Sequence, residues 1–210
     1  GSNYGQPADP SQALVDAGDG VFVPWTSNTI TIKGNRIRFR GDWRNSSGNF
    51  RHLFYGTFAG GYDVTMSGGF DFDGAPVSYI FQNTFRNCSN LTGSIPSGLF
   101  GNLSGAPAGY MFNGTFYNCG NLTDSIPSGL FGNLSGAPAG YMFAGTFYIC
   151  SNLTGSIPSG LFGNLSGAPA TQMFYITFMN CRKLTGKSAL MPDGFTHLYE
   201  QFSTASGDQC

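Results

Sequence analysis

Cysteine is the reactive residue that recurs most regularly in this chain of 210 residues. Cys88, Cys119, Cys150 and Cys181 follow one another at intervals of 31 residues, which match no zinc-ligand pattern. In a stacked repeat their side chains would point the same way, about 4.8 Å apart, which favours buried thiols over disulfides or a metal site. Cys210 is expected to be exposed, as an intermolecular link or a free thiol.

Residues for catalysis are scarce. His52 and His197 lie at opposite ends of the repeats, and Asp124 is the sole charged side chain between Cys88 and Cys181. Paired carboxylates cannot be assembled there, and no serine or cysteine has the glycine-flanked context of a nucleophile elbow. The sequence therefore predicts no enzyme, no catalytic residue, no metal site and no cofactor.

Three other groups each have a functional and a simpler interpretation. The basic residues from Lys33 to Arg51 could bind a polyanion, with Phe39 and Trp43 nearby as stacking partners. The favoured interpretation is that they form the solvated face of a hairpin. The motif Asp71-Phe-Asp-Gly lacks the further ligands of a calcium loop. Asn-x-Ser/Thr sequences are frequent and could carry glycans. They are copied with the repeat, and asparagine also suits turns, so glycosylation is not favoured.

The stretch from Ile80 to Gln172 contains one unit of 31 residues written three times. A fixed period of this length predicts a repeat solenoid, in which each unit buries its apolar side against its neighbours. Including degraded copies at both ends, about five turns are expected. The copies are expected to begin at Leu53, Ile80, Met111, Met142 and Met173.

Within one unit the apolar pattern changes. In residues 111–119 the apolar positions fall at i, i+1, i+4, i+5 and i+8, which predicts a short helix. Leu122–Ile126 is expected to form a brief strand that ends at Pro127. Residues 130–134 suggest one more helical turn, and residues 135–138 form the return corner. Positions that vary between copies avoid the predicted core.

The chain before the repeats is predicted to form a small β-hairpin cap. Val21 and Val23 alternate as in a half-buried strand, and Gly34-Asn35 suits a hairpin turn. The predicted segments are a leader or linker (1–20), an N-terminal β cap (21–52), the solenoid (53–195) and a C-terminal cap or tail (196–210).

The third copy resembles the leucine-rich repeats of BspA-type bacterial surface proteins. The resemblance rests on Phe147, on Cys150 three residues later, on Leu153-Thr, on Ile157-Pro and on Phe162. It implies a right-handed leucine-rich-repeat coil with short parallel strands. It also implies a secreted or surface-anchored protein associated with adhesion. The unit is longer than is common in that family, and its strand segment is one residue shorter.

These features predict an extracellular or cell-surface module that binds a protein or glycan partner through repeated outer positions. The candidate binding residues are Tyr110, Tyr141, Asn113, Tyr117, Asn118 and Tyr148. The alternative is a structural subunit that binds copies of itself in an extracellular fibre or surface layer. A net charge of −1 does not favour nucleic acid. No apolar run approaches the ~20 residues needed to cross a membrane.

Overall fold

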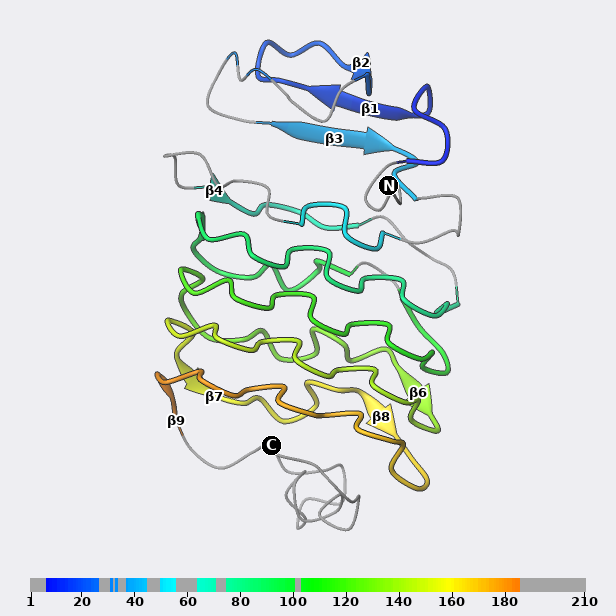
Figure 1. Cartoon of the computed structure of the whole chain (residues 1–210), viewed down its shortest axis with the longest axis vertical. Helices are drawn as coiled ribbons and strands as arrows, with labels where there is room; N and C mark the ends of the chain where they lie inside the picture. Colours follow the sequence, from blue (N-terminus) through cyan, green and yellow to red (C-terminus); the bar gives the residue numbers. More distant parts are fainter. Residues whose placement is uncertain are drawn as a thin grey trace.

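The computed structural model is a tall stack of chain layers with a small sheet at one end (Figure 1). It describes residues 7–26, 31, 33, 37–44, 50–55, 64–70, 75–100 and 103–185. Within these ranges the regular secondary structure consists of short strands, and no helix is present. The helices expected over 111–119 and 130–134 are therefore wrong.

The small sheet has three antiparallel strands, with β1 (Ala13–Asp16) between β2 (Val23–Pro24) and β3 (Arg38–Gly41). β1 lies inside the segment expected to be a leader or linker, so that prediction is wrong for these four residues. Val21 is 58% exposed and lies outside the strands, and Val23 is 49% exposed on β2, which forms an edge of the sheet. The predicted turn at Gly34-Asn35 lies outside the described residues.

Adjacent layers are joined by backbone hydrogen bonds that use every second residue. The N–H groups of Tyr110 and Phe112 donate to the carbonyls of Gly140 and Met142, over 3.0 and 2.8 Å. The N–H groups of the residues in between donate to the carbonyl three residues earlier in the same layer, as the N–H of Thr115 does to Phe112 over 3.1 Å. Each layer is therefore a row of tight turns that is also paired with the next row.

A left-handed residue at every fourth position explains why these rows are not helices. In residues 110–118 the backbone φ is +58° at Tyr110, +63° at Gly114 and +58° at Asn118. A right-handed helix cannot continue through such residues. The apolar spacing that suggested a helix has a true period of four, and pairs of inward residues alternate with pairs of outward ones.

The opposite side of the stack carries short parallel strand pairs. β4 (Val64–Thr65) pairs with β5 (Leu91–Thr92), and β7 (Gly155–Ser156) pairs with β9 (Leu184–Thr185). At the return corner, β6 (Ser135–Gly136) pairs with β8 (Asn164–Leu165). In place of the strand expected over Leu122–Ile126, this layer forms isolated parallel bridges at Leu122 and Ser125.

Columns of phenylalanine rings run through the core, one ring per layer. They are Phe50–Phe81–Phe112–Phe143–Phe174, Phe54–Phe85–Phe116–Phe147–Phe178 and Phe70–Phe100–Phe131–Phe162. In the first column neighbouring centroids lie 5.3 to 5.7 Å apart and the rings are nearly parallel. Burial of each ring stabilises the stack by about 1.5–3 kcal/mol.

The ring columns correct the expected start of the first layer. A start at Leu53 would make Phe54 equivalent to Phe112. Instead Phe54 stacks on Phe85 at 5.4 Å, and Phe50 stacks on the first phenylalanine of the next layer. The expected register is therefore wrong by four residues, which is one turn of the row. A phenylalanine at every fourth position in this part of the sequence makes the two registers look alike.

Candidate interaction face

The rows of turns form one side of the stack, which we call the turn face. It comprises the outward residues of segments 50–55, 79–88, 110–119, 141–150 and 172–181. All six candidate binding residues lie in these segments. Asn118 is exposed, and the other five are partly buried.

Tyrosine rings form a column at the start of three consecutive rows. Tyr79, Tyr110 and Tyr141 stack with centroids 5.1 and 4.8 Å apart and interplanar angles of 19° and 4°. Because the ring faces cover one another, mainly the ring edges and hydroxyls remain to meet a ligand. Tyr79 was not a predicted site residue, although its place 31 residues before Tyr110 was a signal for it.

The amide side chains are partly used to hold the layers together. Asn113 accepts a hydrogen bond from Gln82 Nε2 at 3.0 Å and donates its own Nδ2 to the Ala144 carbonyl at 2.9 Å. Asn118 donates to Asn87 Oδ1 at 3.2 Å. Asn113 is therefore chiefly a structural link, whereas Asn118 combines a link with an exposed position.

A second aromatic pair lies beside a cation. The rings of Tyr117 and Tyr148 are 4.5 Å apart, and the Arg86 guanidinium carbon lies 3.8 Å from the centre of the Tyr117 ring. In the neighbouring layer Arg51 lies over Tyr79 at 4.9 Å. Such contacts hold a planar guanidinium against an aromatic face. Arg86 was missed because a lone arginine has no local sequence signal.

His52 lies in the same part of the face as the two arginines. Burial, with smaller contributions from the positive charges of Arg51 and Arg86, lowers its pKa to about 4. The imidazole is therefore neutral at pH 7. The other predicted histidine, His197, lies outside the described residues.

The four regularly spaced cysteines form a column inside the stack. Cys119, Cys150 and Cys181 are buried free thiols, and the Sγ of Cys119 donates to the carbonyl of Phe85 at 2.9 Å. Cys88 occupies the same place one layer earlier and donates to Phe54. Burial raises the pKa of Cys119 to about 12 and that of Cys181 to about 11, so these thiols are poor nucleophiles. Cys210 lies outside the described residues.

A column of threonines runs beside the cysteines. Thr84, Thr115, Thr146 and Thr177 are at most 1% exposed, and their hydroxyls lie 2.9 to 3.0 Å from a carbonyl 34 residues earlier. The hydroxyls therefore satisfy buried polar groups between layers. No functional role is needed to explain them.

Three of the six residues in the basic group recognised in the sequence are paired with nearby acids. Lys33 pairs with Asp19 at 2.6 Å, and Arg44 pairs with Asp42 at 2.7 Å. Arg38 bonds through Nε to Asp16 at 2.7 Å. Asp16 is 1% exposed, and hydrogen bonds from the Gly18 backbone and from Arg38 lower its pKa to about 2. These pairs stabilise the small sheet and leave less charge for a polyanion.

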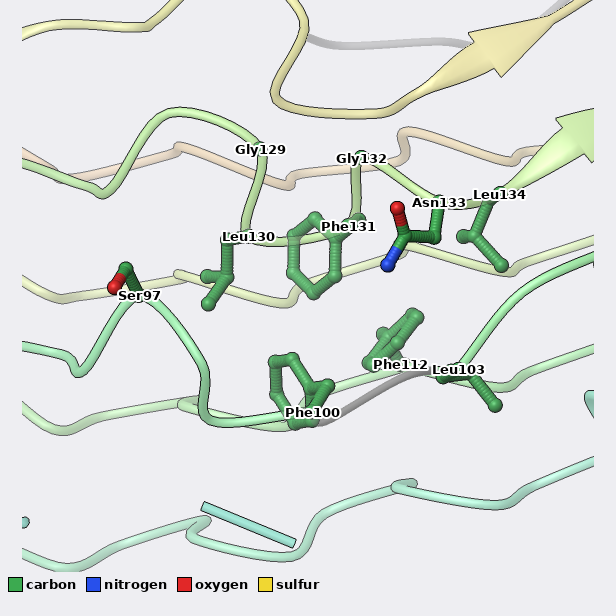
Figure 2. A pocket seen from close by; sticks show the side chains of 10 residues that line it. All are labelled: Ser97, Phe100, Leu103, Phe112, Gly129, Leu130, Phe131, Gly132, Asn133 and Leu134. Atoms are coloured by element: carbon green, nitrogen blue, oxygen red, sulfur yellow. The ribbon is translucent and has the colours of Figure 1, made fainter. Parts of the chain in front are cut away.

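A cavity of about 90 Å³ lies between two layers, away from the turn face. Phe100, Phe112, Leu130 and Phe131 surround it, with Ser97 at its edge (Figure 2). Ligand pockets usually measure about 300–1,000 Å³. This space is therefore a gap in the packing between ring columns.

The described part of the chain holds no group of three or more histidine, cysteine or acidic residues that could bind a metal ion. The calcium candidate, with Asp71, lies outside the described residues. No helix in the described part could cross a membrane. Comparison with protein-family models, curated proteins and solved structures gives no match.

Proposed function

We propose that this chain is a leucine-rich-repeat-like solenoid, similar to BspA-type surface proteins, that acts outside the cell as an adhesion module. Its turn face would bind a protein or glycan partner. The observation that carries the proposal is the repetition of outward tyrosine and asparagine side chains on layers held in register.

Two properties of the face favour binding. Several outward side chains contact a neighbour in the next layer, as Tyr141 contacts Tyr110 at 4.8 Å and Asn118 contacts Asn87 at 3.2 Å, so these side chains lose little freedom on binding. The same groups also recur in successive layers. A partner that is itself repetitive would make several weak contacts at once and gain affinity by avidity.

A second function, self-assembly into a fibre or surface layer, is supported by the last layers of the face. Tyr175 and Met179 are 38% and 41% exposed, and the nearby outward residues Ile149 and Ile176 are also apolar. Exposed apolar groups of this kind favour contacts between copies of a protein.

An array of matrix proteins and glycans tests the adhesion proposal. The variant Asn118→Gly with Tyr148→Ala removes outward groups from the turn face, and glycine suits the positive φ at position 118. The matched control, Thr123→Ala with Ser125→Ala, alters exposed residues on the strand side. Loss of binding in the first variant alone supports the proposal. No binding to the array, or equal loss in both variants, contradicts it.

Native mass measurement with electron microscopy tests the second function. Ordered polymers of the purified chain would support self-assembly and weigh against adhesion as the main role. A monodisperse monomer would exclude the fibre.

A further inference from the structure

A strip of uncharged residues runs along the stack where each row of turns begins. Its sequence is Ala-Pro-Ala-Gly-Tyr in two layers, Ala-Pro-Val-Ser-Tyr in the layer before them and Ala-Pro-Ala-Thr-Gln in the layer after them. We call residues 75–79, 106–110, 137–141 and 168–172 the row-start strip. None of these residues is charged, and all of them are partly or fully exposed. Four layers therefore present a continuous neutral surface.

Backbone hydrogen bonds between layers fix the spacing of the strip. The N–H of Tyr79 donates to the Gly109 carbonyl, and that of Tyr110 donates to the Gly140 carbonyl, each over 3.0 Å. The tyrosine rings follow the same spacing, with Tyr79 and Tyr110 5.1 Å apart and Tyr110 and Tyr141 4.8 Å apart. Equivalent groups of the strip therefore recur at a nearly constant interval along the stack.

The hydroxyls of the tyrosine column remain available to a ligand. The rings of Tyr79, Tyr110 and Tyr141 cover one another, and the Arg51 guanidinium lies 4.9 Å from the centre of the Tyr79 ring. None of the three hydroxyls forms a hydrogen bond within the described structure. A phenol hydroxyl both donates and accepts. The column therefore offers a row of neutral groups that can bond to donors and acceptors alike.

Two glycines leave the backbone uncovered beside the tyrosines. A Cβ added at Gly109 would lie 3.7 Å from the nearest atom, and one added at Gly140 would lie 3.6 Å from the Thr171 carbonyl oxygen. These are ordinary contact distances, and neither glycine has a positive φ. The outer layers have Ser78 and Thr171 at the equivalent position. The fold therefore does not require glycine here, and close approach of a ligand to the backbone is another reason for it.

We propose that the row-start strip binds a neutral, extended glycan of β-1,4-linked sugars that runs along the stack. A sugar ring has apolar C–H groups on its faces and hydroxyls at its edges. Alanine, proline and glycine would pack against the C–H groups, and the tyrosine hydroxyls would bond to the edges. The inference rests on the proposed adhesion function and names the ligand class for the start of the turn face.

The spacing of the strip favours a glycan over a peptide. Side chains on one side of an extended peptide recur about every 6.6 Å, which does not match the tyrosine column. Each sugar of an extended β-1,4-linked chain advances it by a length close to the tyrosine spacing, so one sugar would face each layer. Successive sugars turn over, and hydroxyls that donate and accept can meet either edge. An acidic glycan would find no cation within the strip to pair with.

Calorimetry on the full chain tests the strip with five probes: cellobiose, cellotetraose, cellohexaose, chitotetraose and maltotetraose. We expect a β-linked tetrasaccharide to bind more tightly than cellobiose, with little further gain for cellohexaose, because the strip has four layers. Maltotetraose is α-linked and coiled, so it should bind at least about tenfold more weakly. Because no charge is involved, added salt should leave the affinity unchanged.

Two variants change the strip in different ways. Tyr110→Phe removes one hydroxyl and keeps the ring in its column, and it should weaken tetrasaccharide binding about fivefold. Gly140→Leu covers the open backbone, and it should weaken binding by at least about tenfold. The melting temperature of each variant shows whether it is folded. Tyr110→Phe preserves the packing, so it tests the strip even if the leucine variant is unstable.

Each variant has a matched control on the strand side. Thr123→Ala removes an exposed hydroxyl, and Gly98→Leu adds a side chain to an exposed glycine whose Cβ would meet no atom within 4 Å. Both controls should bind within about twofold of the unmodified chain. Equal loss in a variant and its control, or unchanged binding in Tyr110→Phe, would overturn the strip. A β-linked tetrasaccharide that binds no more tightly than maltotetraose would overturn it as well.

Failure of the strip can be told apart from failure of the adhesion function, because the adhesion test changes Asn118 and Tyr148 near the end of the rows. If no β-linked glycan binds, but a ligand from the array depends on Asn118 and Tyr148, adhesion stands without the strip. If no ligand binds at all, both proposals fail.

Discussion

His52 connects the charge of the turn face to the stability of the protein. Its pKa falls from 6.5 to about 4 on folding, chiefly because the ring is partly buried. Between these pH values the unfolded chain binds a proton that the folded chain does not. This contribution to stability is complete above pH 6.5 and is lost as the pH falls towards 4.

The variant His52→Gln should therefore lose less stability on acidification than the unmodified chain. Urea unfolding of both proteins at about pH 7.5 and about pH 5 measures the difference. Because glutamine does not titrate, the difference in the free energy of unfolding between the two proteins should depend on pH. If this difference in free energy is the same at both pH values, His52 is not held neutral by the fold.

The buried thiol column makes a second prediction at the residue scale. Because burial raises the pKa of Cys119 to about 12, almost no thiolate is present at neutral pH. Iodoacetamide should leave Cys119, Cys150 and Cys181 unmodified in the folded chain and should alkylate them in urea. Mass spectrometry of a Cys210→Ser chain counts the modified sites without interference from that thiol. Rapid alkylation of Cys150 without urea is the result that would contradict a closed core.

Single residues also differ in how well the sequence predicted their positions. The spacing of the cysteines was enough to predict a stacked column. Arg51 was grouped with the basic residues before it, because they are close in the sequence. The fold pairs Lys33 and Arg44 with acids, whereas Arg51 lies in the first row of turns, which is paired with the row that contains Arg86. That relation depends on how layers stack, and no local pattern reveals it.

At the scale of elements, the rows of turns depend on residues that tolerate positive φ. The fourth-residue position holds Asn87, Asn118 and Asn180 in three layers, with φ between +58° and +65°. Ile149 occupies the same position with φ +60°. For a β-branched residue, a left-handed backbone costs about 1–2 kcal/mol. The asparagine and glycine spacing was a sequence signal for turns, but the apolar spacing alone favoured a helix.

Ile149→Asn should therefore stabilise the protein by about 1 kcal/mol, even though it removes an apolar side chain. Chemical denaturation gives the change in the free energy of unfolding. Ile149→Val is the control, because valine is also β-branched and should bring no gain. A destabilised Ile149→Asn would show that the packing of isoleucine outweighs its backbone strain.

Two glycines at equivalent places in the rows should respond differently to alanine. Gly114 and Gly145 have φ of +63° and +62°, so both variants incur similar backbone strain. A Cβ at Gly114 would lie 2.3 Å from Asn83 Oδ1, whereas one at Gly145 would lie 3.5 Å from the nearest atom of Tyr117. Gly114→Ala should therefore destabilise the protein more than Gly145→Ala.

The additional variant Asn83→Gly identifies the cause of that difference. If the contact with Asn83 is responsible, Gly114→Ala should cost less stability in the Asn83→Gly background than in the unmodified chain. Thermal melts of the single and double variants give this comparison. If Gly114→Ala costs the same stability in both backgrounds, the contact with Asn83 is not the cause of the difference.

At the scale of the whole molecule, the repeat and the small sheet differ in how readily they could be predicted. The 31-residue period identified the layers and most of their inward residues, because identical units must bury identical positions. The sheet depends on pairing between segments that are not repeats. β1 is four residues long, and its partners β2 and β3 lie at different distances along the chain, so no periodicity revealed it.

The stacking of the layers predicts that one whole unit can be removed. Deletion of residues 111–141 joins Tyr110 to Met142, and a tyrosine precedes that methionine in the unmodified chain as well. Phe81 would then stack on Phe143, and each column would lose one member. The shortened chain should unfold in one cooperative step, with a smaller denaturant slope because less surface becomes exposed.

A deletion that is two residues shorter provides the matched control. Removing residues 111–139 places Gly140 where Met111 was and moves Met142 to the outward position of Asn113. Because the rows have a period of four, a shift of two exchanges inward and outward pairs in the following layers. Circular dichroism and urea unfolding should show a cooperative fold for the 111–141 deletion and none for the 111–139 deletion. Equal stability of the two would mean that the layers are not held in register by their buried columns, and the solenoid proposal would fail with them.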